Sequence, residues 1–167
     1  MNDTPQEEAE TEVEPGRMFL VVVDDSDEMK IALRFACRRA RHTDGRVALL
    51  YVIEPTEFQH FMGVGDLLAE EARQNAEQFV QRLAVQVKEI SGRLPVVYLR
   101  EGNRRDQLLK LVQEESAISI LVLAASTQSG SPGPLIQALT GKFLSRLTVP
   151  MTVVPGNLSE AAIDAIS

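Results

Sequence analysis

Residues 121–155 read LVLAASTQSGSPGPLIQALTGKFLSRLTVPMTVVP. The stretch predicts a buried strand, a loop rich in glycine, serine and proline, a short helix over 135–147 and a last strand over 149–154. A strand, a helix and a second strand joined in this way build a parallel sheet. Because small residues follow the first strand directly, backbone N–H groups in the loop can approach an anion without obstruction by side chains. A phosphate-bearing ligand is therefore the first functional hypothesis.

The same alternation of strand and helix continues towards the N-terminus. Continuous apolar runs predict three more strands, over 18–23, 47–53 and 95–99, and place the strand that contains Leu121 over 118–123. Apolar residues spaced by three and four predict helices that begin after Ser26, at Asp66 and at Asp106. The expected fold is a single α/β domain, with a doubly wound, five-stranded parallel sheet and helices on both faces. Residues 159–166 are expected to form one or two loose helical turns.

Polar or small residues follow these strands on the side where such a sheet binds ligands. Asp24 follows the first strand, a loop follows Ile53, and Glu101 and Ala124 stand at the ends of the third and fourth strands. The carboxyl ends of parallel strands meet at one edge of the sheet, so we expect these positions to converge on one rim. Asp24 also has a simpler interpretation, in which it or Ser26 caps the following helix; the two side chains can divide these roles.

The net charge of −7 is unevenly distributed along the 167 residues. Residues 1–16 hold six acidic residues and no lysine or arginine, so we expect a disordered acidic tail. The 18 acidic and 17 basic residues of the remainder nearly cancel, which gives no electrostatic case for binding nucleic acid. No run approaches the roughly 20 apolar residues that span a bilayer. These features favour a cytoplasmic protein with a folded body over 17–155 and a C-terminal tail over 156–167.

Other kinds of site find little support in the sequence. His42 and His60 have no cysteine or glutamate at ligand spacing, which argues against a metal site. Cys37 lies on an apolar helix stripe and is expected in the core. Gly141 and Lys142 do not complete a P-loop, because the glycine five residues earlier and the hydroxyl residue after the lysine are absent. No nucleophile–base pair is visible, so at most slow hydrolysis of the phosphate-bearing ligand is expected.

Five motifs, in order along residues 17–155, resemble those of universal stress proteins. VVVDDSD at 21–27 resembles the opening V-D-G-S-E, and LLYVIEP at 49–55 resembles the second strand, L-H-V-x-x-P. REGN at 100–103 resembles E-G-x-P. ILVL at 120–123 and VPMTVV at 149–154 resemble the fourth strand and the closing C-P-V-x-V-V. Each motif alone is weak, but five in register indicate the fold.

The resemblance implies a sheet with strand order 3-2-1-4-5. It also implies a homodimer, formed by antiparallel pairing of the last strands, here 149–154. Some members of the family bind ATP. The resemblance implies that the matching positions in this chain are Asp24, which would lie near the ribose, and the backbone of Val52, which would meet the adenine. Their phosphate-binding motif after the fourth strand is G-x2-G-x9-G-[ST].

The loop of this chain departs from that motif. The nearest match is Gly130, Gly133 and Gly141, two residues short, with Lys142 in place of the hydroxyl residue. Aligned from the end of the strand instead, Ala124 replaces the first glycine. The loop has a simpler interpretation as a solvated turn whose glycines serve its geometry.

Two prolines also affect this loop, because Pro132 and Pro134 each remove an N–H that an anion would use. Lys142 can compensate as a point charge. The hypothesis is that the chain is a stress-response regulatory domain that binds ATP, with or without Mg²⁺. The candidate nucleotide-binding residues are Asp24, Asp25, Ser26, Val52, Ala124, Gly130, Gly133, Gly141 and Lys142. The alternative is a dimeric interaction module of the same fold that binds no nucleotide and meets an unknown protein partner.

Two further groups of residues have both a binding interpretation and a simpler one, and the simpler one is favoured. Phe58, Phe61 and Met62 follow the second strand and could cover a base or meet a partner, but apolar loop residues more often pack onto the body. Arg104 and Arg105 could reach an anion from the same rim, but the more common case is a solvated pair at a helix start, where the helix dipole mildly opposes a cation.

Overall fold

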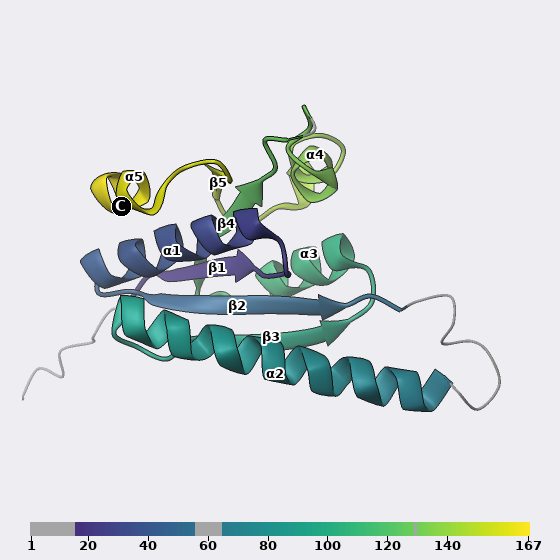
Figure 1. Ribbon diagram of the computed structural model, residues 1–167. Coiled ribbons are helices and arrows are strands. Elements are labelled where there is room, and N and C mark those ends of the chain that lie inside the picture. The colour runs from purple at the N-terminus through teal and green to yellow at the C-terminus, as the bar shows by residue number, and fades with distance from the viewer. Residues whose placement is uncertain (1–15, 56–64, 129) are drawn as a thin grey trace, which may run out of the picture.

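The computed structural model describes residues 16–55, 65–128 and 130–167. They form a five-stranded parallel sheet with strand order β3-β2-β1-β4-β5, which confirms the predicted fold class and order (Figure 1). Almost all of the acidic segment 1–16 lies outside the described residues, as do Phe58, His60, Phe61 and Met62. In the described part of the chain, no helix is both long and apolar enough to cross a membrane.

Strands and helices alternate along the whole chain. The strands are β1 (Met18–Val22), β2 (Arg46–Ile53), β3 (Val96–Glu101), β4 (Ile118–Ala125) and β5 (Met151–Pro155). The helices are α1 (Asp27–His42), α2 (Gly65–Ser91), α3 (Arg104–Glu114), α4 (Pro134–Thr140) and α5 (Glu160–Ile166), with a 3₁₀ turn at Leu144–Arg146.

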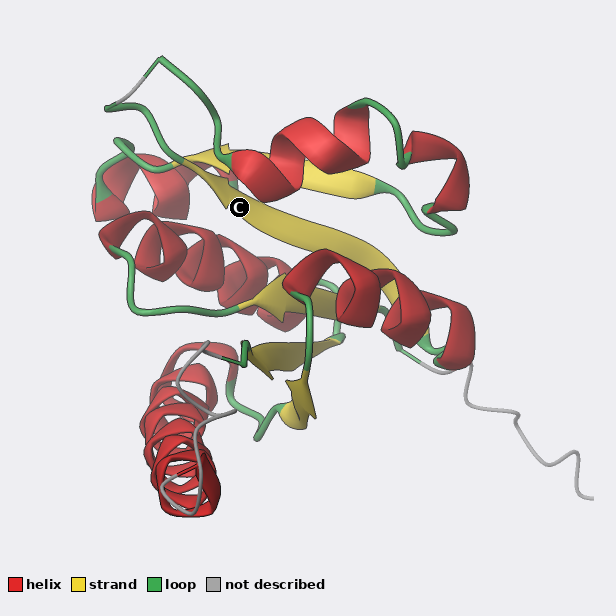
Figure 2. Cartoon of the chain, turned by 90° about the vertical axis from the view of Figure 1, so that its right-hand side faces the viewer, coloured by secondary structure: helices red, strands yellow, loops and turns green. Residues whose placement is uncertain are grey.

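The helices cover both faces of the sheet and bury two separate apolar clusters. The first cluster joins α1, α2 and α5 to one face, and the second joins α3 and α4 to the other (Figures 1 and 2). Successive residues of β1 point to opposite faces, so Phe19 and Val21 enter the first cluster while Leu20 enters the second. This is why the strands read as continuous apolar runs rather than alternating ones.

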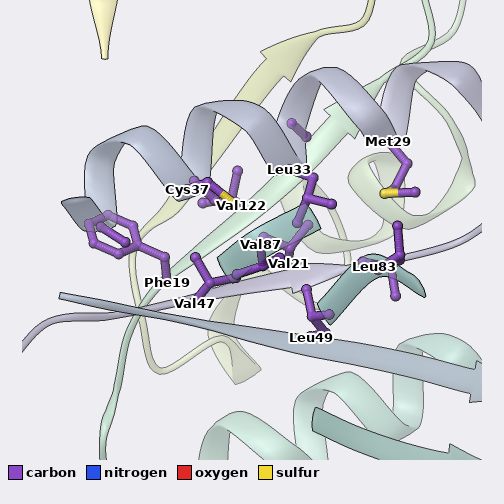
Figure 3. Close-up of a cluster of buried hydrophobic side chains, with 14 of the residues drawn as sticks. Phe19, Val21, Met29, Leu33, Cys37, Val47, Leu49, Leu83, Val87 and Val122 are labelled. Atoms are coloured by element: carbon purple, nitrogen blue, oxygen red, sulfur yellow. The ribbon is translucent and has the colours of Figure 1, made fainter. Parts of the chain in front are cut away.

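Helix α1 forms as its apolar spacing predicts. Met29, Leu33 and Cys37 lie on its buried stripe, over the side chains of the sheet (Figure 3). Burial raises the pKa of the Cys37 thiol to about 12, so the thiol stays protonated and packs as a small apolar group.

The segment after β4 differs from the single helix expected over 135–147. Helix α4 ends at Thr140, because Gly141 has φ −111° and ψ −116°, which are not helical values. The chain then makes only the short 3₁₀ turn. Strand β5 begins at Met151, two residues later than the predicted start at Val149.

The C-terminal residues form a packed helix rather than a loose tail. Ile163 of α5 is fully buried against the first cluster. Asp164 accepts two hydrogen bonds of 2.7 Å from Arg34 of α1, and Arg38 lies 3.3 Å from the same carboxylate. Helix α5 is therefore held on α1 by the burial of Ile163 and by the bidentate Arg34–Asp164 ion pair, with further ion pairs from Arg38 to Asp164 and from Arg34 to Glu160 (3.6 Å).

The Arg34–Asp164 pair predicts a pH-dependent contribution to stability. The hydrogen bond from Arg34 holds the pKa of Asp164 below its usual range. A carboxylate whose pKa is lower in the folded than in the unfolded state stabilises the fold at pH values above its unfolded pKa, which is near 3.9. This contribution is lost as the pH falls through the pKa of the folded state. We expect Asp164→Asn to lower the unfolding free energy at pH 7, and the difference from the wild type to shrink below about pH 4. Urea unfolding at both pH values measures this.

Asp27 provides the control, because its one ion pair within the described residues is with Lys30 on the surface and its side chain is 95% exposed. Asp27→Asn is expected to change stability little at either pH. A loss in Asp164→Asn that stays the same from neutral to acid pH would contradict the assigned role of the charge.

Candidate functional site

The carboxyl ends of β1 and β2 are bridged at one rim of the sheet by the side chain of Arg104. Asp24 follows β1, Glu54 follows β2, and Arg104 begins α3 directly after β3. Arg104 Nη1 lies 3.8 Å from Asp24 Oδ2, and its Nη2 lies 3.8 Å from Glu54 Oε2. The backbone N–H of Arg104 also donates to Glu54 Oε1 (3.1 Å). The predicted convergence of strand ends is therefore present, with an arginine at its centre.

Two hollows adjoin this arginine. The first, of about 130 Å³, lies between the ends of β1 and β4 and the loop that enters α4. Its polar lining consists of Asp24, Ser26, Glu28, Arg104 and Ser126. Its other walls are largely apolar.

The second hollow, of about 210 Å³, lies between α3 and α4. It shares Arg104, Pro134 and Leu135 with the first. Small-molecule sites usually have volumes of about 300–1,000 Å³, so each hollow alone is smaller than a typical site. Together, on either side of Arg104, the two hollows reach the lower end of that range.

Asp24 divides its two oxygens between structure and the hollow. Oδ1 accepts from the backbone N–H of Ser26 (2.9 Å) and from the Ser26 hydroxyl. Ser26 Oγ in turn accepts from the N–H of Met29 (3.3 Å) and so caps α1. Oδ2 faces Arg104, and the side chain is 33% exposed. Ser26 therefore has the capping role, and Asp24 keeps one oxygen at the cleft.

The loop after β4 turns several of its polar groups inward. The N–H of Ser126 donates to the carbonyl of Pro132 (3.3 Å), and the N–H of Gly133 points at Ser131 Oγ (3.4 Å). Gly130 and Gly133 have φ of +67° and +107°, values that favour glycine, so they serve the turn. At the loop positions that line the first hollow, Ser126, Pro132 and Gly133, the N–H groups are therefore engaged within the loop or, at the proline, absent.

Comparison with known proteins gives the family. The model of the universal stress protein family matches residues 17–155. The chain belongs to this family. Among curated proteins, no match to the sequence is found.

Solved structures of other universal stress proteins share the fold. That of UspA from Lactobacillus plantarum is 18% identical, with a TM-score of 0.66, and the match covers 83% of this chain and 97% of that one. The protein from Archaeoglobus fulgidus in complex with dAMP is 17% identical (TM-score 0.53; 83% and 98% covered). The protein from Arabidopsis thaliana with AMP bound is 12% identical (TM-score 0.58; 83% and 91% covered). At these identities, the likeness shows the fold alone.

Four of the predicted site residues of this universal stress protein line the first hollow. They are Asp24, Ser26, Ala124 and Gly133. Asp25 is exposed and lies outside the lining of both hollows. The structure therefore brings together the predicted residues at the ends of β1 and β4 around one hollow.

The other predicted residues line neither hollow. The side chain of Val52 is buried in the second apolar cluster, because β2 is covered on both faces. Gly130 belongs to the turn of the loop, and Gly141 ends α4. The Lys142 ammonium is 5.7 Å from the centre of the Phe143 ring, and no described contact brings it to Asp24.

Glu28 and Glu54, which each line one hollow, were not predicted from the sequence. Arg104 lines both hollows, although a solvated position was the favoured interpretation over contact with an anion. The available signal was the position of Arg104, which follows the carboxyl end of β3 on the same rim as Asp24. Among the described residues, no cluster of three or more His, Cys, Asp or Glu could hold a metal ion.

Proposed function

We propose that this universal stress protein binds an adenine nucleotide in the cleft formed by the two hollows beside Arg104. The observation that carries the proposal is the Asp24 carboxylate, which keeps one oxygen at the cleft, at the end of a central strand. Strand order reverses at β1, between β2 and β4, which is where sheets of this kind bind ligands. Family members crystallised with AMP and with dAMP support the choice of ligand.

The shape of the cleft suggests how a nucleotide lies in it. A ribose hydroxyl that donates to Asp24 Oδ2 places the sugar in the first hollow, next to the end of β1. The ligand then extends past Arg104 into the second hollow, where Pro134, Leu135 and Ala138 offer apolar contact. Equilibrium dialysis with AMP, ADP and ATP tests the proposal. Absence of binding at millimolar nucleotide would end it.

Asp24 and its neighbour Asp25 form a matched pair for testing the ribose contact. Asp24→Asn is expected to weaken adenosine binding about tenfold, because it replaces a charged acceptor with a neutral amide. Adenosine is the ligand of choice, because it carries no phosphate for the lost negative charge to affect. Asp25→Asn removes the same charge outside both hollows and is expected to change adenosine affinity less than about twofold. Isothermal titration calorimetry measures both, and equal effects of the two changes would contradict the contact.

A second candidate function, protein interaction through a dimer, is favoured by the free edge of β5. The carbonyl of Pro150 and the N–H of Gly156 bond to Leu121 and Ala125 of β4, each at 2.9 Å. Main-chain groups alternate sides along a strand, so the N–H and C=O of Met151 and Val153 face away from β4. The side chain of Val153 is also exposed. We propose that this edge pairs with the same edge of a second copy, because a bare edge strand invites association.

A further inference from the structure

The guanidinium of Arg104 is held at the cleft by charge, with its hydrogen-bond donors uncommitted. Its two ion pairs, with Asp24 and Glu54, are both 3.8 Å long. Hydrogen bonds between nitrogen and oxygen fall between about 2.7 and 3.2 Å, so neither pair is a hydrogen bond. The side chain makes no hydrogen bond to any residue that the structure describes. A guanidinium carries five N–H donors, and here they remain available to a ligand.

Two nearby arginines, Arg100 and Arg105, are committed to partners at shorter distances. Arg105, next in sequence, donates to Asp106 (3.0 Å) and stacks on the Phe143 ring, 4.0 Å from its centre. Arg100 donates to Glu114 at 2.8 Å. Arg104 therefore differs from both of these arginines in keeping its side-chain donors free of hydrogen bonds to described residues.

At the positions where the loop after β4 lines the first hollow, backbone donors are engaged or missing, so a cation there favours phosphate binding. Its Ser126 and Gly133 N–H groups are turned inward, and Pro132 and Pro134 have none. Asp24, Glu28 and Glu54 around the cleft all repel an anion. Among the described residues, two arginines line the hollows: Arg105 lines the second hollow alone and donates to Asp106, whereas Arg104 lines both.

We propose that Arg104 is the phosphate-binding residue of the cleft, and that it makes the site prefer phosphorylated adenine ligands to the free nucleoside. The inference rests on the proposed function. An incoming phosphate takes the guanidinium from its two loose carboxylate partners and accepts charge-assisted hydrogen bonds at normal length. The side chain is 36% exposed, so a ligand can reach it from solvent.

Calorimetric titration of AMP and of adenosine into single variants tests this role. Arg104→Gln is expected to weaken AMP binding tenfold or more, the effect of losing charge-assisted hydrogen bonds, and to change adenosine binding less than about twofold. Arg104→Lys keeps the charge and is expected to retain part of the preference for AMP. Glu54→Gln removes a competing carboxylate and is expected to strengthen AMP binding.

Lys110→Gln is the matched control for loss of one positive charge, because Lys110 is exposed on α3 and lines neither hollow. It is expected to leave both affinities unchanged. Circular dichroism and thermal melting of Arg104→Gln and Arg104→Lys establish that each variant is folded.

The outcomes separate this inference from the proposed function. If the wild type binds neither adenosine nor AMP, the proposed function fails, and this inference fails with it. If the wild type binds AMP and Arg104→Gln binds it equally well, the inference is overturned while the proposed function stands. Tighter binding of both ligands by Arg104→Gln also overturns the inference, because Arg104 would then block the cleft.

Discussion

Truncating Leu50 to alanine is expected to lower the free energy of unfolding by about 2–5 kcal/mol. Leu50 lies in β2, is fully buried, and packs in the second apolar cluster with Leu108 and Leu111 of α3. Its carbonyl also accepts from the N–H of Val23 (2.9 Å), which fixes its position beside β1. The cost combines the lost transfer of the side chain from water with the cavity left behind, because neighbours held on two layers cannot close it.

Small domains have a total stability of about 5–15 kcal/mol, so this single change removes a large part of it. Urea unfolding followed by circular dichroism measures the loss. The control is Val97→Ala on the edge strand β3, where the side chain is 40% exposed and a change of about 0.5 kcal/mol or less is expected. A loss for Leu50→Ala as small as that of the control would show that the second cluster does not support the sheet.

Replacing Val153 with proline is expected to convert the proposed dimer into a monomer at micromolar concentration. Proline removes the N–H that faces away from β4, so the bonds from Pro150 and Gly156 to β4 remain. In a symmetric pair of edges, each copy loses one donor. Two lost hydrogen bonds cost about 1–3 kcal/mol, or roughly a ten- to hundredfold weaker association.

Light scattering of wild type and variant measures the mass of the particle. Val153→Thr keeps the N–H and the β-branched shape and is expected to remain dimeric. A wild type that is already monomeric would contradict the proposed pairing, and a Val153→Pro dimer would place the contact elsewhere.

The strands were predictable because their signal is local. The run from Met18 to Val23 is apolar throughout, and the structure buries β1 on both faces. Helix α1 was predictable for a similar reason, since Ser26 caps it and Met29 opens a regular apolar stripe. Asp24 was assigned correctly to the rim, because the end of a central strand fixes its place whatever the loops do.

The remaining features depend on residues far apart in the sequence. The packing of α5 requires Arg34 to meet Asp164, 130 positions away, and no local pattern reports such a pair. Arg104 gains its role only because Asp24 and Glu54, from two other strands, stand on either side of it. Propensity and spacing therefore predicted the fold and one wall of the cleft. The position of Arg104 between Asp24 and Glu54 could be recognised only in the tertiary structure.

The expected phosphate loop illustrates a different limit. Gly130 and Gly141 were singled out by analogy with a motif that this chain carries only in altered form. In the structure one glycine serves a turn and the other ends α4, and the hollows form around other residues. Glycine suits a phosphate-binding loop and also suits a turn or the end of a helix, so the sequence alone did not distinguish these roles.

Native mass spectrometry of the intact protein, freshly purified and then incubated with millimolar AMP or ATP, tests the central claim most directly. We expect the mass of each protomer to rise by that of one adenine nucleotide. A spectrum that contains only the bare chain under both conditions would contradict the account, because the cleft beside Asp24 and Arg104 would then bind no nucleotide.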